Sequence, residues 1–394
     1  MVRTGSCLWA LCAVVVSLCV ACFAGEMNKL TKQEIADGWI LLFDGETTFG
    51  WEPHGEAKWK VADGALVCDE GGRGWLGTTT EFADFILKAE FRVSEGGNSG
   101  IFFRCDKGDQ PWITGYEMQI GDHEKAFTTG SIEGVAPAKP GVLKPNTWQS
   151  AVITAEGDHL TVTLDGTKLV DTTNAKFARG FIGLQHYKPD MKIEARNILL
   201  KPQGLKPIFN GKDLTGWKVV PGHKSVYSVT ADGAMNVKDG NGDIQTEGEW
   251  ADFCFQLDVF SNGKSLNSGV FFRGLKDRFW AGYEVQIRNQ WEGDNRAKPV
   301  DYGTGGIYNR QAARGVVSSD KEWFKITLVA AGNHIATWVD GYQVTDWTDT
   351  RPANDNPRNG CRLKAGVISL QGHDPTTDLS FRNLNVGEYP KPRE

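Results

Sequence analysis

The stretch that decides the fold is Asn98–Ile120, NSGIFFRCDKGDQPWITGYEMQI, and it returns as Asn267–Ile287, NSGVFFRGLKDRFWAGYEVQI. Each copy holds Asn-Ser-Gly, an apolar run ending in Arg, a loop with a Trp, and then Gly-Tyr-Glu-x-Gln-Ile. Because alternate side chains of a strand share a face, Glu117 and Gln119 should point the same way, with Arg104 on the adjacent strand. A solvated cross-strand Arg–Glu pair is the plainer interpretation of a single hairpin, but the recurrence of the pattern favours a site.

The repeat extends over almost the whole chain, which has 394 residues. Phe-Asp-Gly at 43–45 recurs as Phe-Asn-Gly at 209–211, and Ala-Asp-Phe recurs at 83–85 and 251–253. Self-similarity at this spacing predicts two tandem domains, 38–201 and 206–390. The second copy has longer loops beside the candidate site residues, and such loops usually carry selectivity on a rigid β scaffold.

Short strands bounded by turn residues fill both copies. Asp165-Gly166 and Asp340-Gly341 lie between alternating apolar runs, and Asp-Gly there is a strong hairpin signal because the turn needs positive φ. We expect one short helix at Lys32–Ala36 and no βαβ unit. The pattern predicts an all-β chain of two tandem antiparallel jelly-roll β-sandwiches.

Composition narrows the range of partners. The net charge is −6, and no Lys/Arg stripe appears, so we expect no nucleic-acid partner. The chain has 14 tryptophans, and tryptophan is a common stacking surface for sugar rings. These features favour a folded β-protein with aromatic-lined clefts.

The N-terminus reads as a targeting segment. Residues 1–24 combine Arg3 with the apolar run Leu8–Val20, which predicts a signal peptide cleaved after Ala24. The alternative is a lipoprotein anchored through Cys22. No second apolar stretch is long enough to span a bilayer, so we expect an exported protein, periplasmic or secreted, without a transmembrane span.

The remaining cysteines form no metal-binding pattern. Cys68, Cys105, Cys254 and Cys361 include no CxxC pair, so we expect buried thiols rather than a zinc site, although export would permit a disulfide. No cofactor is expected. Calcium is the one metal that the sequence weakly indicates, because several loop residues carry oxygen ligands: Asp294, Asn295, Asp346, Asp349, Asp355 and Asn356.

The motif set as a whole resembles the 3-keto-disaccharide hydrolase domain family, which has a concanavalin-A-like lectin/glucanase sandwich. The resemblance rests on N-S-G-x-F-F-R, Y-E-x-Q-I, T-G-x-I, a late Leu-Gln followed by His, and Arg-Asn-Ile/Leu, twice over. It implies exported bacterial proteins that act on glycosides oxidised at C3. A partner such as a glucoside 3-dehydrogenase would supply the ketone.

The resemblance implies two sets of site residues. The candidate catalytic residues are Glu284, Glu117, His373, His186, Tyr308 and Asp122. The candidate substrate-binding residues are Arg273, Gln286, Tyr283, Gln371, Arg104, Gln119, Tyr116, Gln185, Trp280 and Trp112. Asp122 becomes Asn289 in the second copy, and Tyr308 is Glu133 in the first. These departures suggest that one domain is catalytic and the other binds.

The proton at C2 of a 3-keto sugar is acidified by the neighbouring carbonyl. The hypothesis is that Glu117 or Glu284 removes this proton, that the Arg and Gln of the same copy stabilise the enolate, and that His or Tyr308 protonates the leaving oxygen. Hydration would give net hydrolysis. The alternatives are a non-catalytic carbohydrate-binding or adhesion protein and an ordinary two-carboxylate glycoside hydrolase, for which each copy offers only one repeated carboxylate.

Overall fold

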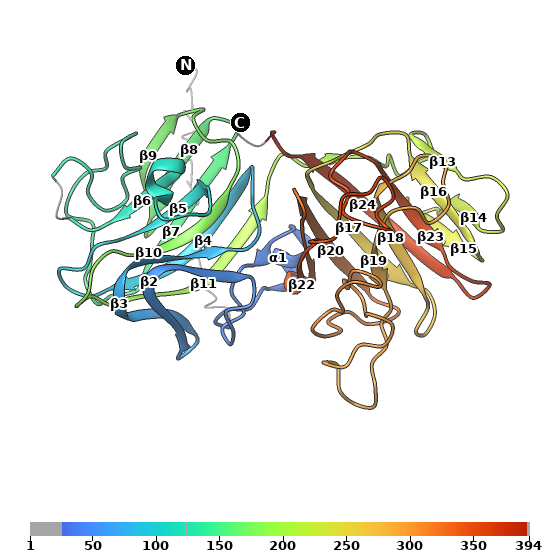
Figure 1. Cartoon of the computed structure of the whole chain (residues 1–394), viewed down its shortest axis with the longest axis horizontal. Helices are drawn as coiled ribbons and strands as arrows, with labels where there is room; N and C mark the ends of the chain where they lie inside the picture. Colours follow the sequence, from blue (N-terminus) through green and yellow to red (C-terminus); the bar gives the residue numbers. More distant parts are fainter. Residues whose placement is uncertain (1–25, 123–124, 392–394) are drawn as a thin grey trace, which may run out of the picture.

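The chain folds into two β-domains that lie side by side, with a short helix between them (Figure 1). The structure is a computed structural model and describes residues 26–122 and 125–391. The expected signal segment 1–24, with Cys22, lies outside the described residues. The expected all-β class is confirmed, and each domain is a layered antiparallel assembly.

The first domain is one 11-stranded sheet that folds over on itself. Its long strand β3 pairs with β10 at one end and with β11 at the other, and so links the two layers. The elements are α1 (Lys32–Ala36), β1 (Ile40–Leu41), β2 (Trp51–Ala62), β3 (Ala65–Thr78), β4 (Phe85–Val93), β5 (Ser99–Cys105), α2 (Pro111–Thr114), β6 (Tyr116–Ile120), β7 (Gln149–Glu156), β8 (His159–Leu164), β9 (Thr167–Thr173), β10 (Phe181–His186) and β11 (Ile193–Pro202).

The second domain splits the same plan into two sheets, of eight and five strands. The smaller sheet has the order β13-β16-β23-β18-β19. The strands are β12 (Lys206–Pro207), β13 (Trp217–Val219), β14 (Val226–Val229), β15 (Met235–Lys238), β16 (Gly242–Thr246), β17 (Phe253–Ser261), β18 (Ser268–Gly274), β19 (Tyr283–Ile287), β20 (Trp323–Ala331), β21 (His334–Val339), β22 (Tyr342–Thr348), β23 (Val367–Gly372) and β24 (Asp378–Glu388).

Local signals account for the helix and the two hairpins. Helix α1 begins with a capping box, in which Thr31 and Glu34 satisfy each other's backbone N–H groups. Asp165 and Asp340 both have φ of +47°, and the glycine after each also has positive φ, as a type I′ turn requires. Both Asp-Gly hairpins and the Lys32–Ala36 helix are therefore confirmed.

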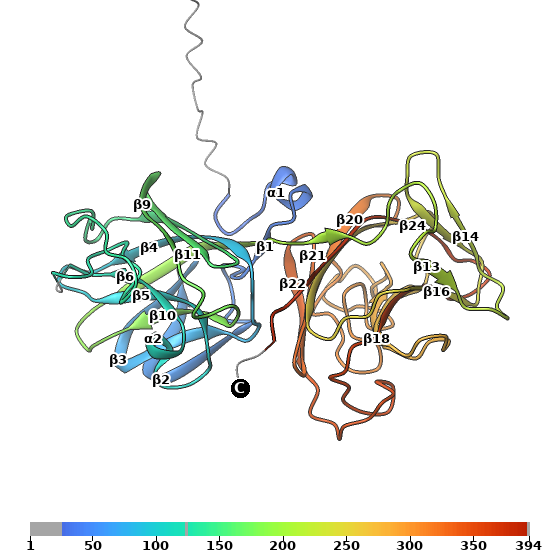
Figure 2. The same cartoon turned by 90° about the horizontal axis from the view of Figure 1, so that it is seen from above.

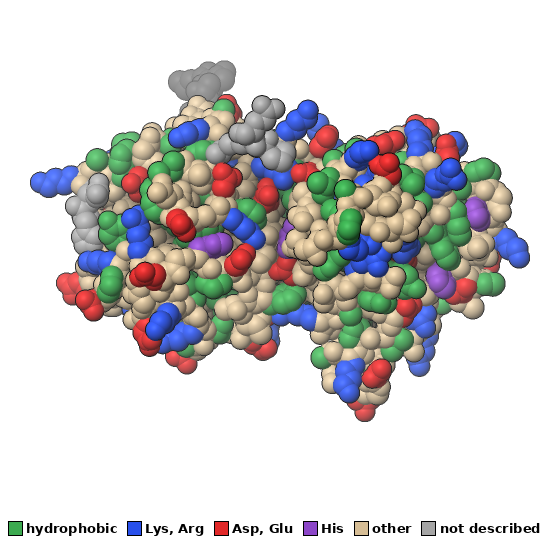
Figure 3. Space-filling view, in the orientation of Figure 1, with side chains coloured by type: hydrophobic (Ala, Val, Ile, Leu, Met, Phe, Trp, Pro, Cys, Tyr) green, Lys and Arg blue, Asp and Glu red, His purple; other side chains and the backbone are tan. Residues whose placement is uncertain are grey.

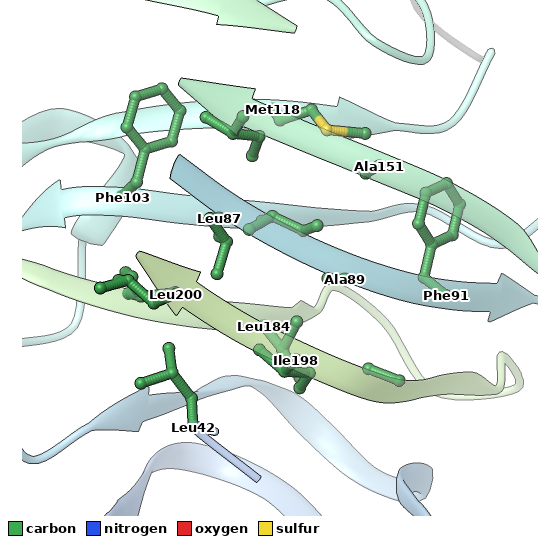
Figure 4. Close-up of a cluster of buried hydrophobic side chains, with 14 of the residues drawn as sticks. Leu42, Leu87, Ala89, Phe91, Phe103, Met118, Ala151, Leu184, Ile198 and Leu200 are labelled. Carbon is green, nitrogen blue, oxygen red and sulfur yellow. The ribbon is translucent and has the colours of Figure 1, made fainter. Parts of the chain in front are cut away.

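The core lies between the layers and follows the alternation of each strand. Leu87, Ala89 and Phe91 of β4 point into the same apolar cluster, to which Phe103 of β5 and Met118 of β6 contribute from the facing layer (Figure 4). The described cysteines are buried free thiols, as expected. Burial of these apolar side chains is the main favourable term in folding.

The two domains share part of one core. Trp338 of β21 packs within the first domain's apolar cluster and donates its indole N–H to the carbonyl oxygen of Leu41 at 3.0 Å. Arg179 of the first domain pairs with Asp252 of the second at 2.7 Å. The view from above shows β1 and β22 adjacent at this junction (Figure 2). The tandem copies are therefore joined by packed side chains as well as by the linker.

The surface carries charge of both signs. On the face shown in Figure 3, acidic and basic side chains are interspersed over both domains. Within residues 26–122 and 125–391, no helix is both long and apolar enough to span a bilayer.

Candidate active site

The candidate site of the second domain is built on one face of the five-stranded sheet. The register aligns residues of β16, β23, β18 and β19 in two rows across this sheet. One row is Asp243, Gln371, Gly269 and Gln286, and the next is Gln245, Ser369, Phe271 and Glu284. The residues between them, such as Ile244 and Val285, point into the core. Period-two alternation thus gathers two carboxylates and three amides on one face.

A cavity of about 280 Å³ opens over this face. It is lined by Asn267, Trp280, Glu284, Gln286, Asp301, Tyr308, Arg358, Gln371 and His373. Asp301 and Tyr308 come from the long connection between β19 and β20, and Arg358 comes from the one between β22 and β23. In Figure 1 the connection from β19 to β20 hangs below the second domain in orange. The sequence-predicted Glu284, Gln286, Gln371, His373, Tyr308 and Trp280 therefore meet in one place.

Glu284 lies in a space that a glycine leaves open. A Cβ at Gly269, on the adjacent strand, would stand 2.5 Å from Oε1 of Glu284. Arg358 donates to the other carboxylate oxygen, Oε2, at 2.6 Å, and its guanidinium lies 4.9 Å from the ring centroid of Phe271. Burial raises the pKa of Glu284, while Arg358 and His373 hold it down.

Asp243 supplies a second carboxylate on the same face. It is 1% exposed, and its Oδ2 accepts the backbone N–H of Trp280 at 2.8 Å. Burial raises the pKa of Asp243 to about 7, and the nearby Glu284 adds to the rise. The site therefore holds a carboxyl group that changes charge near neutral pH.

His373 is oriented by its neighbour in the chain. Its Nδ1 lies 2.9 Å from Oδ2 of Asp374, and its Nε2 lies 3.3 Å from Nδ2 of Asn267 at the cavity. Its ring stacks on Trp280, with centroids 5.6 Å apart and planes at 12°. A carboxylate on one ring nitrogen fixes the tautomer that the other presents, which suits acid–base work.

Five buried polar atoms around this cavity have no hydrogen-bond partner in the described part of the protein. They are Oδ1 of Asp243, Oδ1 of Asn267, Nε1 of Trp280, Oε1 of Gln286 and Oε1 of Gln371. Buried polar groups are nearly always paired in folded proteins, so such a cluster indicates a place for a polar ligand.

The corresponding face of the first domain is different. Its rows are Trp75, Gln185, Gly100, Gln119 and then Gly77, Gly183, Phe102, Glu117. Trp75 thus stands where the second domain has Asp243. A cavity of about 530 Å³ opens here, and Trp112 and Gln185 line it, whereas Glu117 and Gln119 do not.

Glu117 is buried beside a second acid, Glu133, whose effect on its pKa Arg73 only partly offsets. A Cβ at Gly100 would stand 2.1 Å from its Oε1, so Glu117 occupies a space left open by a glycine, as Glu284 does in the second domain. The backbone N–H of Glu133 bonds to the Glu117 carbonyl, as that of Tyr308 does to Glu284. Burial and the Glu133 carboxylate raise the pKa of Glu117 well above its ordinary value.

Two sequence-predicted residues of the first copy lie elsewhere. His186 is fully buried and its ring nitrogens face the carbonyl oxygens of Gly72 and Met191, because it follows Gln185 directly on the strand and so takes the opposite face. His373 stands two residues after Gln371 and returns to the cavity side. Asp122 is exposed, and its Oδ1 accepts the backbone N–H of Thr129.

The prediction that Arg104 and Arg273 belong to the sites is wrong. Both are fully buried and have positive φ, at an irregularity in strand pairing that redirects the side chain out of the alternating pattern. Arg273 donates to the carbonyls of Ala251, Gly332 and Arg362 and to the Asp252 carboxylate.

Arg104 repeats this arrangement in the first domain, with the Ala83 carbonyl and the Asp84 carboxylate among its partners. The repeated Ala-Asp-Phe motif is therefore the partner of the repeated arginine. This pairing is structural and lies away from both cavities.

Tyr116 and Tyr283 are also outside the cavities. One position before Glu117 and Glu284, they take the opposite face and lie in the apolar cores. The hydroxyl of Tyr283 donates to Asp349 at 2.6 Å, and that of Tyr116 donates to the Asn174 carbonyl at 2.7 Å. Strand alternation is the reason in both copies.

Sequence reasoning missed Arg358, Asp243, Asp301, Asn267 and Asp374. Asp301 accepts from Gln286 at 2.8 Å and from Asn267 at 3.1 Å, which holds the two amides at the cavity. Asp374 could have been predicted from its position next to His373, and Asn267 from the repeated Asn-Ser-Gly. Arg358 could not, because it stands in a loop that has no counterpart in the first copy.

The oxygen-rich residues considered for calcium do not gather into a site. Asp346 pairs with His334, and Asp349 pairs with Arg351. In the part of the chain that the structure describes, no three His, Cys, Asp or Glu side chains are grouped so as to hold a metal ion.

Comparison with known proteins places these geometries in context. A family profile described as the 3-keto-alpha-glucoside-1,2-lyase-like domain matches residues 38–201 and 204–387. A 3-keto-disaccharide hydrolase of Bacteroides thetaiotaomicron is 37% identical over 174 residues, which cover 36% of this chain and 60% of that protein. The chain thus matches less than two thirds of that relative's length.

Solved structures align with less than half of the chain. A candidate glycosyl hydrolase of Parabacteroides distasonis is 22% identical with a TM-score of 0.41, over 45% of this chain and 99% of that one. A carbohydrate binding module of Bacillus subtilis is 20% identical with a TM-score of 0.32, over 39% and 95% of the two chains.

Proposed function

The chain belongs to the 3-keto-alpha-glucoside-1,2-lyase-like domain family, with two copies, and from this premise we propose that its second domain cleaves 3-keto-glycosides. The observation that carries the proposal is the set of unpartnered buried polar atoms around the cavity that Glu284 and His373 line, with Asp243 next to Gln371 on the same sheet face. The name of the Bacteroides relative supports a disaccharide oxidised at C3 as the substrate class.

In the proposed reaction, Glu284 takes the proton from C2 of the 3-keto sugar. The electron pair of the C2–H bond moves toward the C3 carbonyl, whose oxygen becomes an enolate. Arg358 faces the same space as Glu284 and stabilises this negative charge. Approach of the substrate ketone to the guanidinium loosens the Arg358–Glu284 bond, so the carboxylate becomes more basic when it is needed.

Collapse of the enolate expels the glycosidic oxygen from C1. His373, acting as an imidazolium whose Nδ1 faces Asp374, gives its Nε2 proton to that oxygen and is left neutral. Asp243 with Gln286 and Gln371 binds sugar hydroxyls. A double bond then joins C1 and C2. Addition of water across it gives the free 3-keto sugar and net hydrolysis; without that addition the unsaturated sugar leaves.

The test compares a 3-keto-glucoside with its unoxidised parent. The oxidised substrate alone should be cleaved, and deuterium at C2 should slow the cleavage because that bond breaks. Glu284→Gln should lower kcat about 10²–10⁴-fold, the range of a lost general base. Glu117→Gln, the matched change in the first domain, should keep the activity. Equal rates for the two E→Q variants would remove Glu284 from the chemistry.

A second candidate is ordinary glycoside hydrolysis, which one specific observation favours. Asp243 adds the second carboxylate that the sequence repeats did not offer, on the same face as Glu284. Two carboxyl groups that flank a glycosidic bond are the usual requirement. Cleavage of the unoxidised glucoside, with no effect of C2 deuterium, would select this function over elimination.

A further inference from the structure

We propose that the cavity of the first domain is a second saccharide site, which binds a neutral, unoxidised hexopyranose unit and does not cleave it. The inference goes beyond the proposed function, because it concerns the other domain and a ligand that the second domain would leave intact. It rests on the lining of a cavity of about 530 Å³ on the face that corresponds to the candidate active site.

The first domain has lost the acid–base groups of the second at the same positions. Trp75 occupies the register position of Asp243, and Glu133 occupies that of Tyr308. His186 is turned into the interior. Glu117 remains, but it does not line the cavity. The chemistry proposed for the second domain therefore has no counterpart here.

Flat rings take the place of the acid. The Trp75 ring lies over Gly77 and Gly183, where a Cβ at either glycine would stand 2.4 Å from the ring. His54 stacks on Trp75, with centroids 4.3 Å apart and planes at 17°, and it lines the cavity. Trp112 packs against the same cluster and lines the cavity from α2. Trp75 itself is 2% exposed, so the half-buried rings of His54 and Trp112 are the planar surfaces left to meet the C–H faces of a pyranose.

Polar groups complete the lining. Gln185 is 5% exposed, and its Oε1 has no partner among the described residues although the side chain lines the cavity. Nε2 of His54 is likewise buried without a partner. These atoms supply hydrogen bonds for sugar hydroxyls where the protein offers none.

Charge selects a neutral ligand. Arg73 lies 4.0 Å from the Trp112 ring centroid, at the edge of the cavity, and two carboxylates, Glu56 and Asp109, share the lining with it. One cation against two anions does not favour an acidic sugar. An unoxidised glucose unit has hydroxyls for all of these groups and needs no base near C2.

The test uses the full chain carrying Glu284→Gln, so that turnover does not interfere. Calorimetric titration with trehalose, sucrose, maltose, cellobiose and lactose should show binding of at least one of them. Arg73→Ala or Trp112→Ala should weaken it about tenfold or more, as loss of an arginine or tryptophan anchor does. Arg73 is exposed, so its removal leaves the fold intact if the tryptophan variant does not fold.

Asp243→Asn, on the site face of the second domain, is the matched control and should leave this binding unchanged. Absence of binding for all five sugars, or binding lost only with Asp243→Asn, would overturn the proposal. Cleavage of a small 3-keto-glucoside by the Arg73→Ala chain should equal that of the parent protein. The experiments can therefore reject sugar binding by the first domain without rejecting cleavage by the second, and the reverse.

Discussion

Arg358 donates a 2.6 Å hydrogen bond from Nη2 to Oε2 of Glu284, although 74 residues separate the two in the chain. The bond joins a loop between β22 and β23 to strand β19, beneath the cavity of the second domain. A buried carboxylate with one cationic partner has a pKa set by the balance of burial and charge. This pair therefore links the geometry of the site to its pH dependence.

Arg358→Gln should move the acidic limb of the kcat/KM profile to higher pH. Arg358 holds the pKa of Glu284 down against burial, so its removal raises that pKa further, and a base must be ionised to act. The rate at the optimum should also fall about 10²–10³-fold, as for loss of one enolate donor. Arg358→Lys keeps the positive charge, so it should return the acidic limb toward its original pH more fully than it restores the rate at the optimum. The control is Arg382→Gln, which removes an arginine that lies over the Trp323 ring away from the cavity. An acidic limb that stays in place in Arg358→Gln would contradict the pairing of Arg358 with Glu284.

Gly269→Ala should damage cleavage by displacing Glu284. The new methyl would stand 2.5 Å from Oε1, too close for any real contact, so the carboxylate must move. Displacement of a reacting group by about 1 Å costs roughly 100-fold in rate. Gly100→Ala makes the same change beside Glu117 and serves as the matched control, with activity on a 3-keto-glucoside expected to persist. A larger loss for Gly100→Ala would place the chemistry in the first domain.

Stability should fall as the pH rises above about 4.5, the ordinary pKa of a glutamate, in part because of Glu117. Its pKa is raised in the folded state, so the unfolded chain releases this proton first and gains relative to the fold. Glu117→Gln should reduce the difference between the urea midpoints at pH 5 and pH 8. An unchanged difference would show that Glu117 is not buried in this way.

Arg273→Met should unfold the second domain more readily. It removes four hydrogen bonds and leaves three backbone carbonyls and Asp252 short of a donor in the interior. Loss of one partner of a buried ion pair costs about 3–5 kcal/mol, which a urea titration resolves. At urea concentrations below the unfolding transition, the Michaelis constant should stay within about twofold of the parent value, because the change leaves substrate binding untouched. A marked rise in the Michaelis constant would return Arg273 to the site.

The sequence anticipated the face of Glu284 and Gln286 because strand alternation is local. It misplaced His186, which follows Gln185 directly and so takes the opposite face, whereas His373 stands two residues after Gln371. It misplaced Arg273 because an irregularity in strand pairing, at a residue with positive φ, breaks the alternation on which the inference rested. Nothing in the local pattern around Arg273 announces that irregularity.

By itself, the sequence determined that the chain is two copies of one β-architecture and which strand residues can share a face. Backbone pairing and the period of two depend only on neighbours along the chain and across one strand. Only the tertiary structure decided that Arg358 reaches Glu284, that Asp243 stands beside Gln371, and that Trp75 takes the matching place in the first domain. These contacts depend on loop paths and sheet register, which many distant residues fix together.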